Sequence, residues 1–335
     1  MNILVTGGLG YIGSHTVVAL QQAGFQVIII DDLSNSDIRF LDKIKKITGE
    51  MPKFYQIDLK DNNSLNDLFS KESINGIIHF AAYKAVGESV EKPLIYYKNN
   101  LLGLINLLDA VAQFGTDHFI FSSSCTVYGQ ADQMPINENT PLKRPESPYG
   151  KTKHMGEEII YDFVQAEQKN AIALRYFNPV GAHPSSLIGE IPKGIPNNLL
   201  PYITQTAAGI RESLGVFGND YTTRDGTAIR DYIDVNDLAD AHVKALNYLL
   251  NKENSNNLEY FNLGSGKGST VLEMIEAFEN ANNLKINYNI LPRRAGDIQE
   301  AYADFSQAKN KLNWKPTTPL QESMRTAWEF QKKLL

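Results

Sequence analysis

The sequence is poor in cysteine, because Cys125 is the only one among its 335 residues. A single thiol excludes an intrachain disulfide and a cysteine-based metal site, and it suits a reducing compartment, so we expect a cytoplasmic protein. His15, His79 and His118 adjoin expected helices or strands and lack the spacing of metal ligands. The sequence therefore predicts no metal centre.

Excess positive charge is also missing. Lys and Arg number 32 against 38 Asp and Glu, and no Lys/Arg cluster occurs, so nucleic acid is not an expected partner. No apolar run approaches the length of about 18 residues that a membrane-spanning helix needs. The chain opens on a strand-like run, Ile3–Val5, without the pattern of a signal peptide. We therefore expect no membrane partner.

Short apolar runs alternate with longer amphipathic segments in the first half of the chain. The runs Ile3–Thr6, Val27–Ile30, Ile77–Phe80 and Phe119–Ser122 are typical of strands buried on both faces, with helical patterns between them. This alternation predicts an α/β protein with a Rossmann-type, doubly wound parallel sheet.

The pattern changes after a further expected strand, Ala171–Tyr176. Asn178–Gly181 opens a stretch rich in proline, which we expect to be irregular and not sheet. Asp231–Leu246 is typical of a short strand and a helix, and Tyr260–Leu263 of another strand. The predicted first domain spans residues 1–178, with 231–264 returning to it, and residues 179–230 and 265–335 form a smaller C-terminal α/β substrate domain.

A glycine-rich loop follows the first expected strand. Gly7, Gly10 and Gly13 lie in Thr6–Gly13 with the spacing G-x-x-G-x-x-G, directly before a helical pattern. Glycines allow a tight turn, and the helix N-terminus offers N–H groups to a pyrophosphate. Asp31-Asp32 ends the second strand, where an acid accepts ribose hydroxyls and repels a 2′-phosphate. These features predict a dinucleotide site that prefers NAD to NADP.

Tyr149 and Lys153 form a candidate proton-transfer pair. Their i, i+4 spacing places them on one face of a helix that begins after Pro148. Lowering a tyrosine pKa from about 10 to about 7 takes roughly 4 kcal/mol, so we expect Lys153 and an oxidised nicotinamide ring to act together. Ser124 follows another buried strand, where it can pass a hydrogen bond between a substrate and the phenolate.

At this point the sequence resembles the extended short-chain dehydrogenases/reductases, and among them the UDP-glucose 4-epimerases. The resemblance covers nearly the whole chain. The segments that carry it are Thr6–Gly13, Lys84–Ser89, Ser122–Gly129, Ser147–Lys153, Arg175–His183, Gly194–Pro201 and Arg293–Asp297.

The resemblance implies an enzyme that interconverts UDP-glucose and UDP-galactose through a 4-keto intermediate, with tightly bound NAD. It makes Tyr149, Ser124 and Lys153 catalytic. With the glycine loop, it predicts these cofactor-binding residues: Gly7, Gly10, Tyr11, Ile12, Gly13, Asp31, Asp32, Asn35, Ser36, Asp58, Leu59, Phe80, Ala81, Ala82, Lys84, Asn99, Ser122, Tyr149, Lys153 and Phe177.

The UDP-hexose is expected between the two domains. Arginines suit a pyrophosphate, an apolar pair suits uracil, and an acid suits a ribose. The expected substrate-binding residues are Lys84, Ser124, Tyr149, Asn178, Asn198, Leu199, Val216, Phe217, Arg230, Arg294 and Asp297. Relatives of this kind are commonly homodimers, so the resemblance also implies a homodimer.

The sequence departs from some members of the family at Ala301, where they carry a tyrosine. A smaller side chain leaves more room beside the hexose, so UDP-N-acetylglucosamine and UDP-N-acetylgalactosamine are further expected substrates. Tyr302 would fill this space after a one-residue shift.

Two other functions remain open from the sequence. A sugar-nucleotide 4,6-dehydratase or decarboxylase shares the fold and the tyrosine-lysine pair, but related dehydratases have Asp-Glu where this chain has Cys125-Thr126. A non-catalytic NAD-sensing regulator would be free to lose Tyr149 or Lys153, whereas this chain keeps both.

Overall fold

The computed structural model describes residues 1–294 and 297–335, and within these ranges the main sheet has seven strands in the order β10-β6-β5-β4-β1-β2-β3. All neighbouring strands are parallel. The strands are β1 (Asn2–Thr6), β2 (Gln26–Asp31), β3 (Lys53–Gln56), β4 (Gly76–His79), β5 (His118–Ser124), β6 (Asn170–Tyr176) and β10 (Leu258–Leu263). The strand order reverses between β1 and β4, the switch point at which such sheets bind ligands. The predicted fold class is confirmed.

Helices cover both faces of this sheet because successive strand residues point to opposite sides. Ile3 and Val5 pack with α1 (Tyr11–Gln22), α2 (Phe40–Thr48) and α9 (Val235–Leu250). Leu4 packs with α3 (Asn62–Lys71), α6 (Gly103–Phe114) and α7 (Pro148–Glu167) on the other face. Shorter helical segments near the sheet are α4 (Val86–Glu91), α5 (Pro93–Tyr97), the π-helical turn η1 (Lys98–Leu102) and the 3-10 turn η2 (Cys125–Tyr128).

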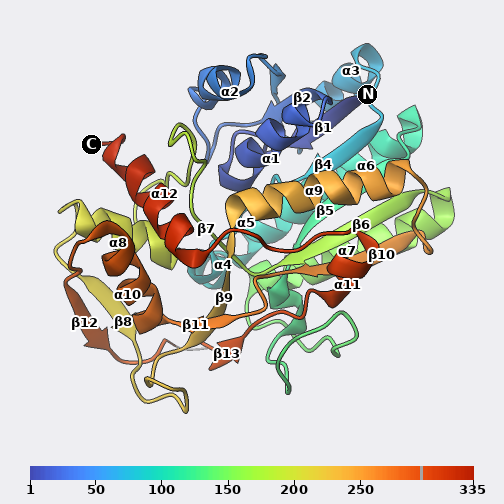
Figure 1. The fold of residues 1–335 in the computed structure, drawn as a ribbon. Coiled ribbons are helices and arrows are strands. Elements are labelled where there is room, and N and C mark those ends of the chain that lie inside the picture. Colours follow the sequence, from blue (N-terminus) through green and yellow to red (C-terminus); the bar gives the residue numbers. More distant parts are fainter. Residues whose placement is uncertain (295–296) are drawn as a thin grey trace.

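The chain leaves this first unit after β6 and returns to it later. β10 pairs with β6 from Leu258 to Leu263, and α9 packs against α1, as Figure 1 shows. Asp231–Asp234, by contrast, belong to β9 (Ile229–Asp234), which lies in a smaller sheet. The domain boundary near residue 178 stays a prediction.

The second unit contains two small sheets and the helices α8, α10 and α12 within the described residues, on the left of Figure 1. Met274, Phe278 and Met324 belong to its buried core. Its elements are β7 (Asn178–Val180), α8 (Leu199–Ala207), β8 (Leu214–Phe217), β9, β11 (Gly268–Thr270), α10 (Val271–Asn282), β12 (Tyr288–Leu291), β13 (Glu300–Ala301) and α12 (Leu320–Lys332). The helix α11 (Ser306–Lys311) packs instead against β10 of the main sheet.

The expectation of irregular chain at Asn178–Gly181 was wrong for its first three residues. They form β7, which pairs in parallel with β9. Among the described strands β7 pairs with β9 alone, so it is an edge strand and Pro179 removes no necessary ladder hydrogen bond.

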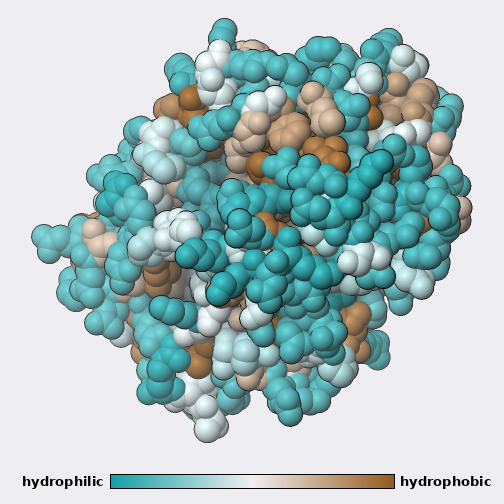
Figure 2. Space-filling model, turned by 45° about the vertical axis from the view of Figure 1, so that its right-hand side comes forward, coloured by the Kyte–Doolittle hydropathy of each residue, from teal (hydrophilic) through white to brown (hydrophobic). Residues whose placement is uncertain are grey.

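No described helix has both the length and the apolar character needed to cross a membrane. Among the same residues, no cluster of three or more His, Cys, Asp or Glu side chains has a geometry that would hold a metal ion. Figure 2 shows a face covered mainly by hydrophilic side chains, with hydrophobic side chains gathered mostly in its upper half.

Candidate active site and cofactor cleft

One cleft at the carboxyl ends of the central strands brings together the residues expected to bind the cofactor. It is lined by all of them except Phe177, and Tyr149 and Lys153 share it with the glycine loop. Phe177 is buried in an apolar cluster with Val127 and Tyr128, so its contact with a cofactor stays a prediction.

The glycine loop forms a tight cradle at the start of α1. Gly7 has a φ of +66°, which favours glycine, and a side chain at Gly13 would bring its Cβ within 2.3 Å of the Gly7 carbonyl oxygen. Gly10 is the N-cap residue of α1 and supplies no side-chain cap. The first-turn N–H groups of α1 are therefore available to an anion, as a dinucleotide pyrophosphate requires.

Asp31 lies beside this loop at the end of β2. Its carboxylate accepts hydrogen bonds from the Leu9 N–H (3.1 Å), the Leu33 N–H (3.0 Å) and the Ser36 hydroxyl (2.6 Å). Burial raises its pKa, and these bonds oppose that effect. They hold the carboxylate in the cleft, where it can accept ribose hydroxyls.

Tyr149 and Lys153 lie on the first turns of α7, as the sequence predicts. Ser147 caps this helix, because its hydroxyl accepts the Gly150 N–H at 3.1 Å. The Lys153 Nζ donates to the Ser122 carbonyl oxygen (2.5 Å) and lies 6.0 Å from the centre of the Tyr149 ring. Ser124 ends β5 two residues after Ser122, so the two serines lie on the same face of the sheet.

Burial opposes charge on both members of this pair. It raises the pKa of Tyr149 to about 12, with a hydrogen bond from Ser124 acting in the other direction. It also lowers the pKa of Lys153 to about 7, with the charge of Glu157 opposing the shift. Without a further cation in the cleft, Tyr149 stays protonated at neutral pH. This agrees with the expectation that Lys153 alone does not form the phenolate.

The sequence did not predict a buried ion pair that contacts β5. Glu157 and Arg175 are both 3% exposed, and Arg175 donates to Glu157 through Nε (2.8 Å) and Nη2 (2.6 Å). Glu157 also accepts the Ser123 hydroxyl at 2.5 Å. Because Ser123 lies between Ser122 and Ser124, this pair fixes the strand end that carries Ser124. The only sequence signal was the i+4 position of Glu157 relative to Lys153.

The expected nucleotide-binding residues gather in the second unit around Asp297. Arg230 pairs with Asp297, Arg294 approaches the same carboxylate at 3.5 Å, and the Arg294 guanidinium lies 4.7 Å from the centre of the Phe217 ring. Val216 instead points into the core, because side chains alternate along β8. Ala295 and Gly296 of the arginine motif lie outside the described residues.

Glu190 joins two of the remaining expected positions and was not predicted. Its Oε1 accepts from the Lys84 Nζ (2.8 Å) and the Asn198 Nδ2 (2.7 Å). Asn198 occupies the N-cap position of α8 and Leu199 begins this helix, while Asn178 begins β7.

Arg230 lies near the strand end that carries Ser124. Cys125, which follows Ser124, packs in one apolar cluster with Ala301, and Ala301 on β13 pairs with Arg230 on β9.

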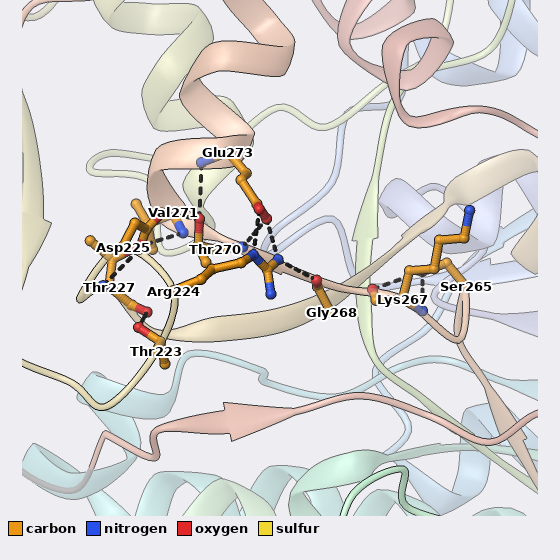
Figure 3. A network of polar contacts seen from close by, with 10 residues as sticks. All are labelled: Thr223, Arg224, Asp225, Thr227, Ser265, Lys267, Gly268, Thr270, Val271 and Glu273. Carbon is orange, nitrogen blue, oxygen red and sulfur yellow. Dashed lines mark hydrogen bonds and ion pairs between the residues drawn. The ribbon is translucent and has the colours of Figure 1, made fainter.

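The loop after β8 is held by a polar network, which Figure 3 shows. Arg224 forms an ion pair with Glu273 on α10 and donates to the Gly268 carbonyl oxygen at 2.7 Å. Asp225 accepts from Thr270 and from the Thr227 N–H (2.8 Å). The network attaches this loop to the N-terminus of α10.

The same loop anchors the arginine motif. Arg293 donates to the Asp220 side chain (2.7 Å) and carbonyl oxygen (2.6 Å), and its guanidinium lies 3.9 Å from the centre of the Tyr221 ring. Since Arg293 directly precedes Arg294, the loop helps to position the arginine that stacks on Phe217.

Three comparisons with known proteins agree with this geometry. A family model described as GDP-mannose 4,6 dehydratase matches residues 4–327. A UDP-glucose 4-epimerase from Erwinia amylovora is 50% identical over 332 residues, covering 99% of this chain and 98% of the relative.

Two solved structures match over nearly their whole length. A UDP-glucose-4-epimerase from Stenotrophomonas maltophila, with bound NAD and formylated UDP-arabinopyranose, is 45% identical with a TM-score of 0.96, covering 100% of this chain and 98% of that one. A UDP-glucose 4-epimerase from Bifidobacterium longum, in complex with NAD+ and UDP, is 42% identical with a TM-score of 0.96, covering 99% and 98%. Since these matches cover nearly the whole chain, the chain belongs to the extended short-chain dehydrogenase/reductase family, in its UDP-glucose 4-epimerase branch.

Proposed function

We propose that the protein uses NAD to invert C4 of UDP-hexoses, interconverting UDP-glucose and UDP-galactose through a 4-keto intermediate. The observation that carries this proposal is that Tyr149 and Lys153 line the same cleft as the glycine loop and Asp31. A base and a dinucleotide cradle in one cleft suit reversible oxidation of a substrate hydroxyl.

The residues of the cleft fit NAD. Gly7, Gly10 and Gly13 leave space for the pyrophosphate, and Asp31 accepts ribose hydroxyls. When bound, NAD+ supplies reversible two-electron oxidation of the substrate carbon and a positive charge beside the phenol.

The side chains of this chain then manage the proton. The Tyr149 phenolic oxygen takes the proton from the C4 hydroxyl and later returns it, while Ser124 passes a hydrogen bond between sugar and phenol. Lys153, held by the Ser122 carbonyl, orients Tyr149 and favours its phenolate. Arg230 and Arg294 hold the pyrophosphate as the 4-keto sugar turns its opposite face to the site, so the configuration at C4 is inverted.

The direct test is incubation of the purified protein with UDP-galactose, without added NAD, while chromatography follows UDP-glucose. We expect UDP-glucose to form, because the cofactor is retained and recycled. Formation only after NAD is added would mean that the cofactor was lost during purification. No product in the presence of NAD would contradict the proposal.

The structure gives little support to a dehydratase or decarboxylase. Beside Ser124, the chain places Cys125 and Thr126, and the Thr126 hydroxyl donates to the Ser124 hydroxyl at 3.0 Å. A carboxyl pair that would remove water across C5 and C6 is not supplied by these two positions. Absence of a 4-keto-6-deoxy sugar from the same reaction mixture would agree with this, and turnover itself excludes a purely regulatory protein.

We also propose that the N-acetylated UDP-hexosamines are substrates. Ala301 is buried beside Phe177 and Val127, whereas the Tyr302 ring lies against Gly268, so Tyr302 does not fill the place of Ala301. Ala301→Tyr should remove turnover of UDP-N-acetylglucosamine and spare that of UDP-galactose. If the unchanged protein leaves both N-acetylated sugars unconverted at saturation, this extension is wrong.

We also propose that the protein is a homodimer. Large apolar side chains are exposed along consecutive helical segments: Leu94 (69% exposed) and Ile95 on α5, Leu102 on η1 and Ile105 on α6. Such a cluster is typical of an interface between protein chains. Light scattering should give a dimer mass, and Leu94→Asp should shift it toward the monomer. A monomer before substitution would contradict the proposal.

A further inference from the structure

A short segment of the second unit crosses the cofactor cleft. Residues Gly189–Lys193, Ile195 and Asn197 line the cleft together with the glycine loop and the residues after β2. We call residues 189–198 the bridging segment. It follows β7 in the chain, so the sequence assigned it to substrate binding and not to the cofactor.

One end of the bridging segment is fastened by Glu190. Its carboxylate accepts the Lys84 ammonium (2.8 Å), and its side chain is only 14% exposed. Lys84 follows β4 and lines the cleft. The side chain of Asn198 donates to the same Glu190 oxygen at 2.7 Å, so the segment also holds its own carboxylate in place.

The middle of the bridging segment is fastened by Lys193 to the loop after β2. The Lys193 Nζ donates to the backbone carbonyl oxygens of Leu33 (2.9 Å) and Ser34 (2.7 Å). Leu33 has a φ of +61°, a left-handed conformation that leucine rarely adopts. Its N–H donates to Asp31, so the carboxylate at the ribose position also fixes the residue whose carbonyl receives Lys193.

We propose that Lys193 retains the cofactor in the cleft. This inference rests on the proposed binding of NAD. A dinucleotide that lies between the glycine loop and the bridging segment can leave only when the segment separates from the first unit, which requires the Lys193 bonds to break. Lys193 binds the loop after β2, whereas Tyr149 lies on α7, so the loss of Lys193 should speed cofactor release without changing the chemical step.

The test measures bound NAD and its release. The full-length protein and its variants are purified, NAD per chain is determined by chromatography of an acid extract, and release after dilution is followed by ultrafiltration. We expect Lys193→Met to release NAD about tenfold faster than the unchanged protein. With saturating added NAD, its turnover of UDP-galactose should be unchanged. Lys193→Arg keeps a donor and should restore slow release.

Lys333 provides a matched control. Its Nζ donates to the Ser185 carbonyl oxygen at 2.7 Å, another bond from an exposed lysine to the backbone, but both partners belong to the second unit. Lys333→Met should leave NAD release unchanged. If Lys193→Met releases NAD at the wild-type rate, or if Lys333→Met accelerates release equally, the inference about Lys193 is wrong and the proposed function still stands. If the wild-type protein neither retains NAD nor binds added NAD, both the proposed function and the inference are wrong.

Discussion

Tyr149 shows, at the scale of a single residue, how burial and chemistry oppose each other. Its pKa of about 12 reflects an apolar environment, yet the proposed reaction needs a phenolate. Moving this pKa to about 7 takes about 7 kcal/mol at 1.36 kcal/mol per pKa unit, more than a lysine of lowered pKa supplies. We therefore expect the Tyr149 phenolate to form only when the cleft holds a second cation.

Tyr149→Phe should abolish most of the turnover and leave the fold intact. The substitution removes the oxygen that accepts the proton, and loss of a positioned acid-base group costs about 10²- to 10⁴-fold in rate. UDP-glucose formation from UDP-galactose measures the effect. Tyr161→Phe, at an exposed position on the same helix, is the control and should keep full activity. Unchanged turnover in Tyr149→Phe would refute its role as the base.

The buried ammonium of Lys153 should lower the free energy of unfolding at neutral and acidic pH relative to pH 10. Its folded-state pKa, about 7, is below the value of about 10.4 for an unfolded lysine, so between these values the unfolded chain binds more protons. Stability therefore rises with pH through this window, and the cost of the buried ammonium is complete below pH 7.

Lys153→Met removes this cost, so its gain in free energy of unfolding should be largest near pH 6 and smaller by a few kcal/mol near pH 10. Urea unfolding at both pH values measures it, with Lys151→Met on the same helix as the control. A gain that is the same at both pH values would show that the ammonium is not desolvated.

At the scale of elements, the loop between β8 and β9 connects stability with nucleotide binding. The Arg224–Glu273 pair attaches it to α10 (Figure 3), and Asp220 and Tyr221 attach it to Arg293. The loop contains no catalytic group, so loosening it should weaken substrate binding and spare the chemical step.

Arg224→Ala should raise the KM for UDP-galactose about fivefold at most, with kcat nearly unchanged, because an exposed ion pair contributes up to about 1 kcal/mol. Calorimetric titration with UDP should show the same weakening of binding. Arg325→Ala removes a comparable exposed pair with Glu322 on α12 and should change neither value. A fall in kcat without a change in KM would contradict the positioning role of the loop.

The sequence predicted the strands of the main sheet and missed most of those in the small sheets for a physical reason. β1, β2, β4, β5 and β6 are apolar runs buried on both faces, so their pattern is visible locally. β8, β11, β12 and β13 have two to four residues each and depend on partners far along the chain. Local patterns do not contain that information.

The same division applies to the candidate site. The glycine loop, Asp31, Tyr149 and Lys153 belong to short motifs with fixed spacing, and the structure brings them to one cleft. Glu157 with Arg175, and Lys193 with the loop after β2, acquire their roles from contacts between distant segments. A single sequence gives no spacing that would reveal such pairs.

At the scale of the whole molecule, buried histidines should make the fold sensitive to acid. Burial lowers the pKa of His15 and His79 to about 3 and that of His242 to about 4. An unfolded histidine binds a proton near pH 6.5, so between pH 6.5 and pH 5 the unfolded chain binds more protons and stability falls as the pH falls.

These groups together should change the free energy of unfolding by up to about 4 kcal/mol per pH unit, since each proton contributes 1.36 kcal/mol. Urea unfolding at pH 7, 6 and 5 measures the slope. The buried Asp31, Asp231 and Asp234, whose pKa values are raised, bind protons in the folded state and oppose the effect at lower pH. A change in the free energy of unfolding of less than about 1.4 kcal/mol per pH unit, which corresponds to one proton, would show that the buried imidazoles are hydrated.

The late return of β10 to the main sheet also determines when this protein can fold during its synthesis. β6 leaves the ribosome well before its neighbour β10, because β7, α8, β8, β9 and α9 come between them. Until then β6 has an open edge, and the sheet face that α9 covers is bare. The nascent first unit therefore remains incomplete until most of the second has been made, and we expect a chain that ends between them to expose the edge of β6.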